Sequence, residues 1–234
     1  MFGQGSAFSG FGVTVSAETT AFAANALDAE PGPLARPASS FHGFRELAAT
    51  IYSRTSLLLQ TLANVYGKEG LLRSIHRYAL AQRFQHPEPD ALIGAFEAEM
   101  GHEVANTLRT ALETNGWVDY RVAQLSTTEL PAGRWTNTVV LERLGTLAFP
   151  ISVSMKLKSG ETLSRRWLST DPRVTWNLVT ASPVEAVNVD PEGAVLLETE
   201  RQNNARFLTT PPHAWTLLER IVFWTDSLLS GVFP

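Results

Sequence analysis

Residues 51–87 read IYSRTSLLLQTLANVYGKEGLLRSIHRYALAQRFQHP, and this stretch decides the fold of the first half of the chain. Apolar residues recur at helical spacing on both sides of Gly67, which predicts one helix from about Phe44 to Tyr66 and a second from about Lys68 to Phe84. Gly67 suits a helix end because glycine readily takes a left-handed conformation. His86-Pro87 cannot continue the second helix, since proline lacks an amide hydrogen and restricts the residue before it. The side chains that this spacing groups on the apolar sides are Leu47, Ile51, Leu58, Leu62 and Val65, then Leu71, Leu72, Ile75, Tyr78 and Ala79.

Two more helices are predicted downstream. The third begins near Asp90 and stops at Gly101, and the fourth stops at Asn115-Gly116. Four successive helices with short turns predict an α-helical domain. The apolar positions that define the last two helices are Ile93, Phe96 and Met100, then Val104, Leu108 and Leu112.

The chain upstream of these helices has weaker patterns. Residues 1–12 mix Gly, Ser and Phe without a period, which predicts a loop or a frayed end. A weak helix is expected to follow, with Ser16 as its N-cap. Residues 31–40 then read as a loop that is long for a connection inside a compact domain.

After Trp117 the apolar period changes from helical to two, which predicts strands. Residues 151–157 alternate apolar and polar side chains, and Ser159-Gly160 turns the chain into a partner strand, so a hairpin is expected here. Several short strands in this region fit a β-sandwich of immunoglobulin-like size, which spans about 100 residues. Residues 211–234 return to a helical period. The further alternating sets are Leu163, Arg165 and Trp167, then Val174, Trp176 and Leu178, then Val187 and Val189.

The predicted fold class is therefore α+β. An α-helical domain is expected over residues 1–117, a small β-sandwich over 118–205, and an amphipathic C-terminal helix over 206–234.

Composition excludes several classes of function. The formal charge of −4 gives no electrostatic case for nucleic acid. With no cysteine there is no disulfide framework, thiolate zinc site or cysteine nucleophile. The N-terminus lacks the pattern of a signal peptide, and no apolar run approaches the about 20 residues of a membrane span, so the sequence is compatible with the cytosol and we expect no membrane partner.

An ordered series of short motifs resembles the gluzincin aminopeptidases, the zinc metallopeptidases of the membrane alanyl aminopeptidase type. In that family Tyr-x-Lys-Gly opens a helix, and the motifs that follow have counterparts here over about residues 41–205. Arg54 and Thr55 stand at the Lys and Gly positions, which is a departure from the family pattern. The matching residues, in chain order, are Tyr52, Thr61-Leu62, Tyr66-Gly67, Arg77-Tyr78, Arg83-Phe84, His86-Pro87, Pro89-Asp90, Phe96-Glu97, Met100-Gly101, Thr114-Asn115-Gly116-Trp117 and Asp119-Tyr120.

The resemblance implies the second half of a thermolysin-like catalytic domain, followed by a small immunoglobulin-like sandwich. It also implies zinc, a peptide substrate cleaved at its N-terminus, and Tyr52 as the residue that stabilises the oxyanion of the tetrahedral intermediate. A phenol suits this role because it donates a hydrogen bond without carrying charge. The plain alternative is that Tyr52 is a core aromatic of an apolar helix.

The zinc ligands of the family are absent from this chain. There is no H-E-x-x-H motif, and the nearest two histidines, His76 and His86, are ten residues apart, whereas two ligands on one helix need about three or four. We therefore expect no metal ligand in this chain and no activity from it alone. The missing upstream half of the catalytic domain is then a candidate partner.

Other charged residues have plain interpretations. Arg54 is expected to be solvated or to pair with a carboxylate such as Glu46. Arg73, His76, Arg77 and Arg83 form a basic cluster that is expected to be a solvated helix face.

Two functions from other classes stay open. The chain could be a non-catalytic module, derived from such an enzyme, that binds a peptide or a partner protein. A carbohydrate-binding sandwich is supported only by Trp167 and Trp176, which fit a sandwich core equally well.

Overall fold

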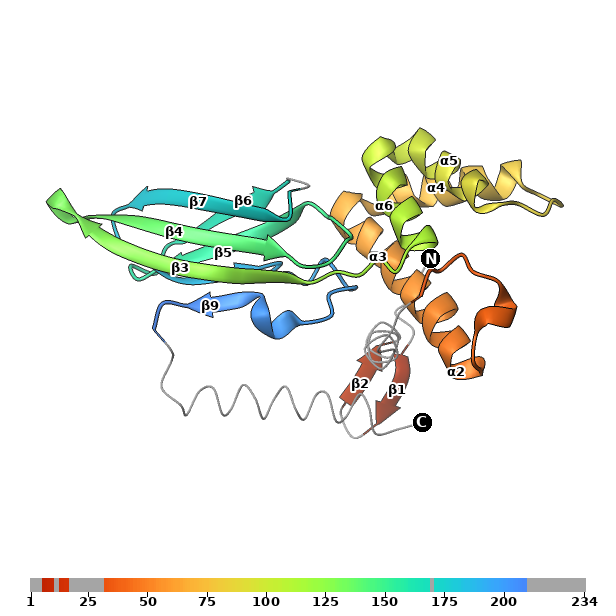
Figure 1. Ribbon diagram of the computed structural model, residues 1–234, viewed down its shortest axis with the longest axis horizontal. Helices are drawn as coiled ribbons and strands as arrows, with labels where there is room; N and C mark the ends of the chain where they lie inside the picture. Colours follow the sequence, from red (N-terminus) through yellow and green to blue (C-terminus); the bar gives the residue numbers. More distant parts are fainter. Residues whose placement is uncertain (1–5, 11–12, 17–31, 169–170, 210–234) are drawn as a thin grey trace.

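The computed structural model describes residues 6–10, 13–16, 32–168 and 171–209. Within these ranges the chain is a mixed α+β structure, with the helices at one end and two larger antiparallel sheets at the other (Figure 1). The helical segments are η1 (Ala38–Ser40), α2 (Phe44–Leu47), η2 (Ala48–Arg54), α3 (Thr55–Tyr66), α4 (Lys68–Ala81), α5 (Pro89–Met100), α6 (His102–Glu113), η3 (Pro131–Gly133) and η4 (Arg201–Asn203). The strands are β1 (Ser6–Gly10), β2 (Val13–Ser16), β3 (Tyr120–Leu130), β4 (Arg134–Arg143), β5 (Ile151–Leu157), β6 (Thr162–Trp167), β7 (Arg173–Thr180), β8 (Val184–Val189) and β9 (Ala205–Phe207).

The helix expected from Phe44 to Tyr66 exists but is not uniform. It runs as α2, the π-helical turn η2 and α3 without leaving helical geometry. Gly67 ends it at φ +106°, in the region that favours glycine. α4 ends at Ala81, three residues before the predicted end. Helical geometry is lost at Gln82, and Phe84 follows with φ +62° before His86-Pro87.

The apolar face of α4 is narrower than its sequence predicts. Leu71 is buried, but Leu72 and Ala79 are exposed. Ser74 is buried instead, because its hydroxyl donates to the Gly70 carbonyl one turn earlier at 2.9 Å and so needs no solvent. The predictions for α5 and α6 are confirmed more closely, since Ile93, Phe96, Val104 and Leu108 are all buried.

The two sheets have the strand orders β3-β4-β7 and β6-β5-β8-β9. The predicted hairpin of residues 151–167 is confirmed as β5 and β6, with Ile151 opposite Trp167. Buried residues of both sheets belong to one apolar cluster that also includes α3, α5 and α6. Trp167 and Trp176 are both buried in it, which contradicts a carbohydrate-binding role for these two rings.

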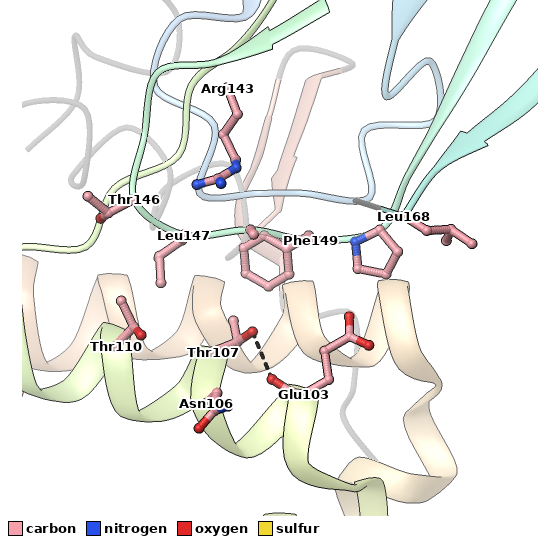
Figure 2. A pocket seen from close by; sticks show the side chains of 11 residues that line it. Glu103, Asn106, Thr107, Thr110, Arg143, Thr146, Leu147, Phe149 and Leu168 are labelled. Carbon is pink, nitrogen blue, oxygen red and sulfur yellow. Dashed lines mark hydrogen bonds between the residues drawn. The ribbon is translucent and has the colours of Figure 1, made fainter. Parts of the chain in front are cut away.

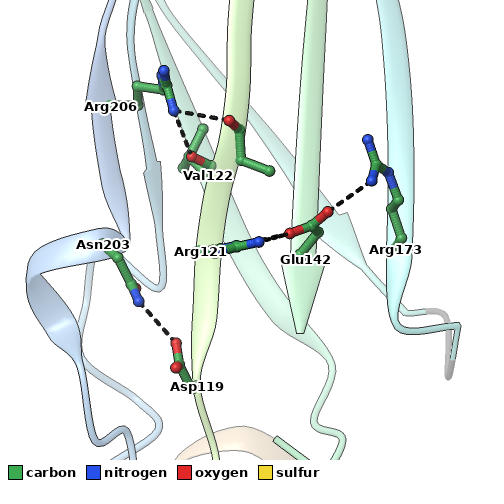
Figure 3. Close-up of polar contacts among 8 residues, drawn as sticks. Asp119, Arg121, Val122, Glu142, Arg173, Asn203 and Arg206 are labelled. Carbon is green, nitrogen blue, oxygen red and sulfur yellow. Dashed lines mark hydrogen bonds and ion pairs between the residues drawn. The ribbon is translucent and has the colours of Figure 1, made fainter. Parts of the chain in front are cut away.

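The longest strands, β3 and β4, were not predicted from the sequence. They pair from Tyr120 opposite Arg143 to Leu130 opposite Arg134, and a bulge interrupts the register between Val122 and Gln124. Arg206 donates to the Ala123 carbonyl at this bulge, at 2.8 Å (Figure 3). The bulge in β3 is therefore bound by a side chain of β9.

Asn137 of β4 is a buried amide that joins the two sheets. Its Nδ2 donates to the Thr180 hydroxyl at 2.8 Å and to the Leu178 carbonyl at 3.3 Å. Its Oδ1 accepts from the Val184 amide at the start of β8, at 2.9 Å. Because a buried amide is costly unless it is satisfied, these contacts fix how β7 leads into β8.

Residues 190–204 connect the helices to the sheets. The Leu196 amide donates to the Thr61 hydroxyl of α3 at 3.0 Å. The Thr199 amide and hydroxyl both donate to the Val118 carbonyl, at 3.1 and 2.9 Å. Residues 196 and 199 thus contact α3 and the connection between α6 and β3.

Two expectations concern the ends of the chain. Residues 6–10 and 13–16 form the antiparallel pair β1-β2, so the loop predicted for residues 1–12 is wrong for 6–10, and Ser16 is a strand residue. Alternating side chains in so short a stretch give little signal beside the glycines. The C-terminal helix was predicted over residues 206–234. Residues 206 and 207 belong to strand β9 instead, and residues 210–234 lie outside the described ranges. Among the helices that are described, none is long and apolar enough to span a membrane.

Candidate functional site

Tyr52 lies on the π-helical turn η2, and its side chain is 65% exposed. The expectation of a core aromatic is therefore wrong for this residue. A π-helical turn inserts one residue into an α-helix and is found frequently at functional sites. Here it changes the direction of the side chains between Ala48 and Arg54, so that Tyr52 faces solvent while Thr50 and Arg54 are buried.

Arg54 fixes the end of this turn. Its guanidinium donates to the Gly32 carbonyl at 2.6 Å and to the Gly116 carbonyl at 2.8 Å. The side chain is buried, so the expectation of a solvated arginine is wrong. Sequence spacing could not show this, because both acceptors are main-chain atoms of distant segments.

Glu46 has a different partner, Arg36. The Arg36 guanidinium donates to one carboxylate oxygen and the His42 amide to the other, both at 2.6 Å. The His42 amide first, and then Arg36, lower the pKa of Glu46. These contacts hold together the segment from Arg36 to Glu46, just before the π-helical turn.

The described residues contain no group of three or more His, Cys, Asp or Glu side chains that could hold a metal ion. His76 and His86 are exposed, and His102 contacts Glu97 at 2.9 Å. The donor set of the described chain therefore does not fit a zinc site.

The basic cluster on α4 borders a shallow hollow of about 420 Å³. Arg73 and Arg77 are both exposed and both bind Glu99 of α5, at 3.2 and 2.8 Å. Arg77 first, and then Arg73, lower the pKa of Glu99. Arg73, His76 and Arg77 form a solvated face, as expected, and the two arginines share the Glu99 carboxylate. Arg83, the fourth member of the cluster, is exposed beyond the end of α4 at Ala81.

A second pocket, of about 260 Å³, was not found from the sequence. It lies between α6 and the segment that connects β4 to β5 (Figure 2). Glu103 and Arg143 are its charged lining residues. They are 40 positions apart and lie on unlike elements, so no local motif could indicate them.

The buried carboxylate Glu198 was not identified from the sequence. It is fully buried and accepts hydrogen bonds from the Tyr120 amide at 3.1 Å and the Glu200 amide at 3.4 Å. Burial, with a further contribution from the nearby Asp119, raises the pKa of Glu198 to about 7 against these hydrogen bonds. Its position after the apolar run of residues 195–197 was the only available signal.

No protein-family model matches the sequence, and no curated protein matches it. Among solved structures the chain is similar to the crystal structure of Legionella pneumophila aminopeptidase A in complex with aspartic acid, at 10% sequence identity and a TM-score of 0.45. The alignment covers 64% of this chain, which spans 18% of the length of that chain.

Proposed function

We propose that this chain is the C-terminal portion of a zinc aminopeptidase-like metallopeptidase, with Tyr52 as the residue that stabilises the oxyanion. The observation that carries the proposal is the exposed phenol of Tyr52 on an anchored π-helical turn. The ordered series of motifs around it supplies the family. In this proposal the helices are the second half of a thermolysin-like domain, and the two sheets are an immunoglobulin-like sandwich.

The role of Tyr52 follows from its chemistry. As the carbonyl of a scissile peptide bond becomes tetrahedral, its oxygen gains negative charge, and a fixed phenol can donate a hydrogen bond to it. Such a donor contributes about 3 to 4 kcal/mol when it is positioned in advance. Arg54 supplies the positioning, because its bonds to Gly32 and Gly116 hold the residue two places after Tyr52.

Zinc must be held by residues outside the described chain, because the donor set here does not fit it. The partner in this proposal is the upstream half of the catalytic domain, and the substrate is a peptide cleaved at its N-terminus. The chain by itself is inactive.

The experiment compares this chain with a longer chain extended upstream in its natural reading frame. We expect bound zinc and aminopeptidase turnover only in the longer chain. Tyr52→Phe in that chain should lower kcat by about 10²- to 10³-fold, as for loss of one oxyanion donor, with zinc content unchanged. Tyr78→Phe on α4 is the matched control and should leave kcat unchanged.

Two outcomes would overturn parts of the proposal. Zinc and turnover in this chain alone would contradict its inactivity. If the longer chain also lacked zinc, the peptide- or protein-binding module would replace the enzyme.

A further inference from the structure

Strand β7 is the open edge of the three-stranded sheet. β4 pairs with one side of it over eight consecutive residue pairs, and no described strand pairs with its other side. In Figure 1 it lies on the opposite side of the two larger sheets from β9. The other edge, β3, is covered in part, because Arg206 of β9 donates to the Ala123 carbonyl at 2.8 Å. β7 is therefore the edge of this sheet that can accept a further strand.

The pairing with β4 decides which backbone groups of β7 are free. The Arg143 amide donates to the Pro172 carbonyl at 2.8 Å, just before the first residue of β7. In an antiparallel pair, residues that exchange hydrogen bonds alternate with residues that do not, so every second residue of β7 turns its amide and carbonyl away from β4. Those residues are Arg173, Thr175, Asn177 and Val179, and their backbone groups have no hydrogen-bonding partner in the described chain.

β7 lacks the features that usually protect an edge strand. It contains no proline and no bulge, and its only charged residue is Arg173 at its first position. On its outward side Val179 is 51% exposed, and on its inward side Val174 and Leu178 are only partly buried. A strand added here would bond the free backbone groups and cover the two partly buried side chains.

The charge along this open edge is basic. The charged residues within β6 and β7 are Arg165, Arg166 and Arg173. Arg165 is exposed, and its guanidinium reaches from β6 to lie 4.8 Å from the centre of the Trp176 ring of β7. Arg173 binds Glu142 at 2.8 Å, so Arg165 is the main charge that an added strand meets. A carboxylate suits this position, whereas a second copy of the chain would bring the like charges of its own β6 and β7.

We propose that β7 binds an extended acidic segment of a partner protein, which adds to the sheet as an antiparallel strand. The backbone of this segment bonds the free amide and carbonyl groups of β7. Its inward side chains pack on Val174 and Leu178, and a carboxylate between them binds Arg165. In this mode of binding the backbone bonds supply affinity and the alternate side chains supply selectivity. The binding edge does not depend on the peptidase proposal.

The first experiment measures amide hydrogen exchange of this chain by NMR. Without a ligand, Thr175 and Asn177 should exchange fast and Val174, Trp176 and Leu178 slowly, since only the second group bonds to β4. The probe is the peptide Ac-VTVTETVE-NH2, whose fifth residue, a glutamate, lies opposite Trp176 in the antiparallel register. With a dissociation constant on the order of 1 mM, it should slow the exchange of Thr175 and Asn177. Unchanged exchange of these two amides at saturating peptide would overturn the proposal.

Modified peptides separate strand addition from simple attraction of charge. N-methyl groups on the fourth and sixth residues remove two amide donors that face β7, so affinity should fall at least about tenfold. N-methyl groups on the third and fifth residues point away from β7 and should leave affinity unchanged. Lysine in place of both glutamates should weaken binding at least about tenfold. Equal binding of the two N-methylated peptides, or of the acidic and lysine peptides, would overturn the proposal.

Variants of the chain test the other side of the contact. Arg165→Gln should weaken binding of the acidic peptide about tenfold, and its matched control is Arg166→Gln, one position along β6 on the opposite face. Thr175→Pro removes a free-edge amide without breaking a bond to β4 and should abolish binding. Equal binding by Arg165→Gln and Arg166→Gln would overturn the proposal. So would a dimer of the unmodified chain, seen by analytical ultracentrifugation and dissociated by Thr175→Pro, since a second copy would then be the occupant.

Discussion

The π-helical turn and the start of β3 each combine a tyrosine with a buried charge, yet they use the two groups in opposite ways. At the turn Tyr52 is exposed, and Arg54 is buried on two carbonyl groups. At the strand Tyr120 is 1% exposed, and Glu198 is buried on the Tyr120 and Glu200 amides. In both regions main-chain groups form hydrogen bonds with the buried side chain.

The two buried groups differ in whether their charge can change with pH. Arginine keeps its charge at any ordinary pH, so Arg54 is a permanent anchor that leaves Tyr52 facing outward. Glu198 can lose its charge by binding a proton, and Tyr120 uses its hydroxyl on Phe149 instead of on solvent. The first region is therefore built to present a side chain, and the second to hold the core together.

The sharpest test truncates each tyrosine. Tyr120→Ala should lower the free energy of unfolding by about 3 to 5 kcal/mol, as for other large aromatic residues removed from a core, because it also removes the edge contact with Trp167 at 5.5 Å between ring centres. Tyr52→Ala should change it by less than about 0.5 kcal/mol, because an exposed residue leaves no cavity. Urea denaturation of both variants measures their free energies of unfolding. Equal losses of stability in the two variants would contradict the different roles of the two tyrosines.

A second test uses the proton on Glu198. Its pKa is about 7 in the folded chain and 4.5 when unperturbed, so between these values the folded chain holds a proton that the unfolded chain releases. The stability from this group is fully present below about pH 4.5 and is lost as pH rises through 7, by up to about 3 kcal/mol.

Glu198→Gln does not titrate, so its stability relative to the unmodified chain should increase between pH 5 and pH 8. The measurement is the free energy of unfolding at several pH values in this range, which covers most of the transition. The exposed Glu185→Gln on β8 is the control and should show no such trend. If the difference in stability between Glu198→Gln and the unmodified chain stayed constant over this range, the Glu198 carboxyl would not change its charge there.

The smallest predicted effect on stability comes from removing the hydroxyl group of one tyrosine. Tyr120→Phe keeps the ring but leaves the Phe149 amide and carbonyl without this partner, so it should lower the free energy of unfolding by about 1 to 3 kcal/mol. Tyr52→Phe should leave it unchanged. Thermal and urea unfolding of the pair measure the difference, and a loss in Tyr52→Phe would show that its hydroxyl has a structural contact.

Local patterns predicted the parts of the fold that depend on local physics. The helices around Gly67 and Gly101 and the hairpin at Ser159-Gly160 follow from periodicity and turn residues. β3 and β4 were missed, because their bulge at residue 123 breaks the alternation and their outward face contains the buried Val140.

The candidate site also has features that local sequence patterns indicate and features that they do not. Tyr52 could be named from the motifs around it, but its exposure depends on a π-helical turn that no sequence period indicates. The anchors of Arg54 are carbonyl groups, which every residue has, so the sequence could not identify them. Glu103 and Arg143 come together only because β4 returns toward α6.

The bond between the Leu196 amide and the Thr61 hydroxyl joins positions 135 residues apart. A growing chain emerges from the ribosome at about 5 to 20 residues per second, so α3 waits many seconds for this partner after its own helical bonds have formed. Such long-range closure is slow, and the last step in forming the helical end of the molecule is expected to be the arrival of residues 190–204, which lie between β8 and β9.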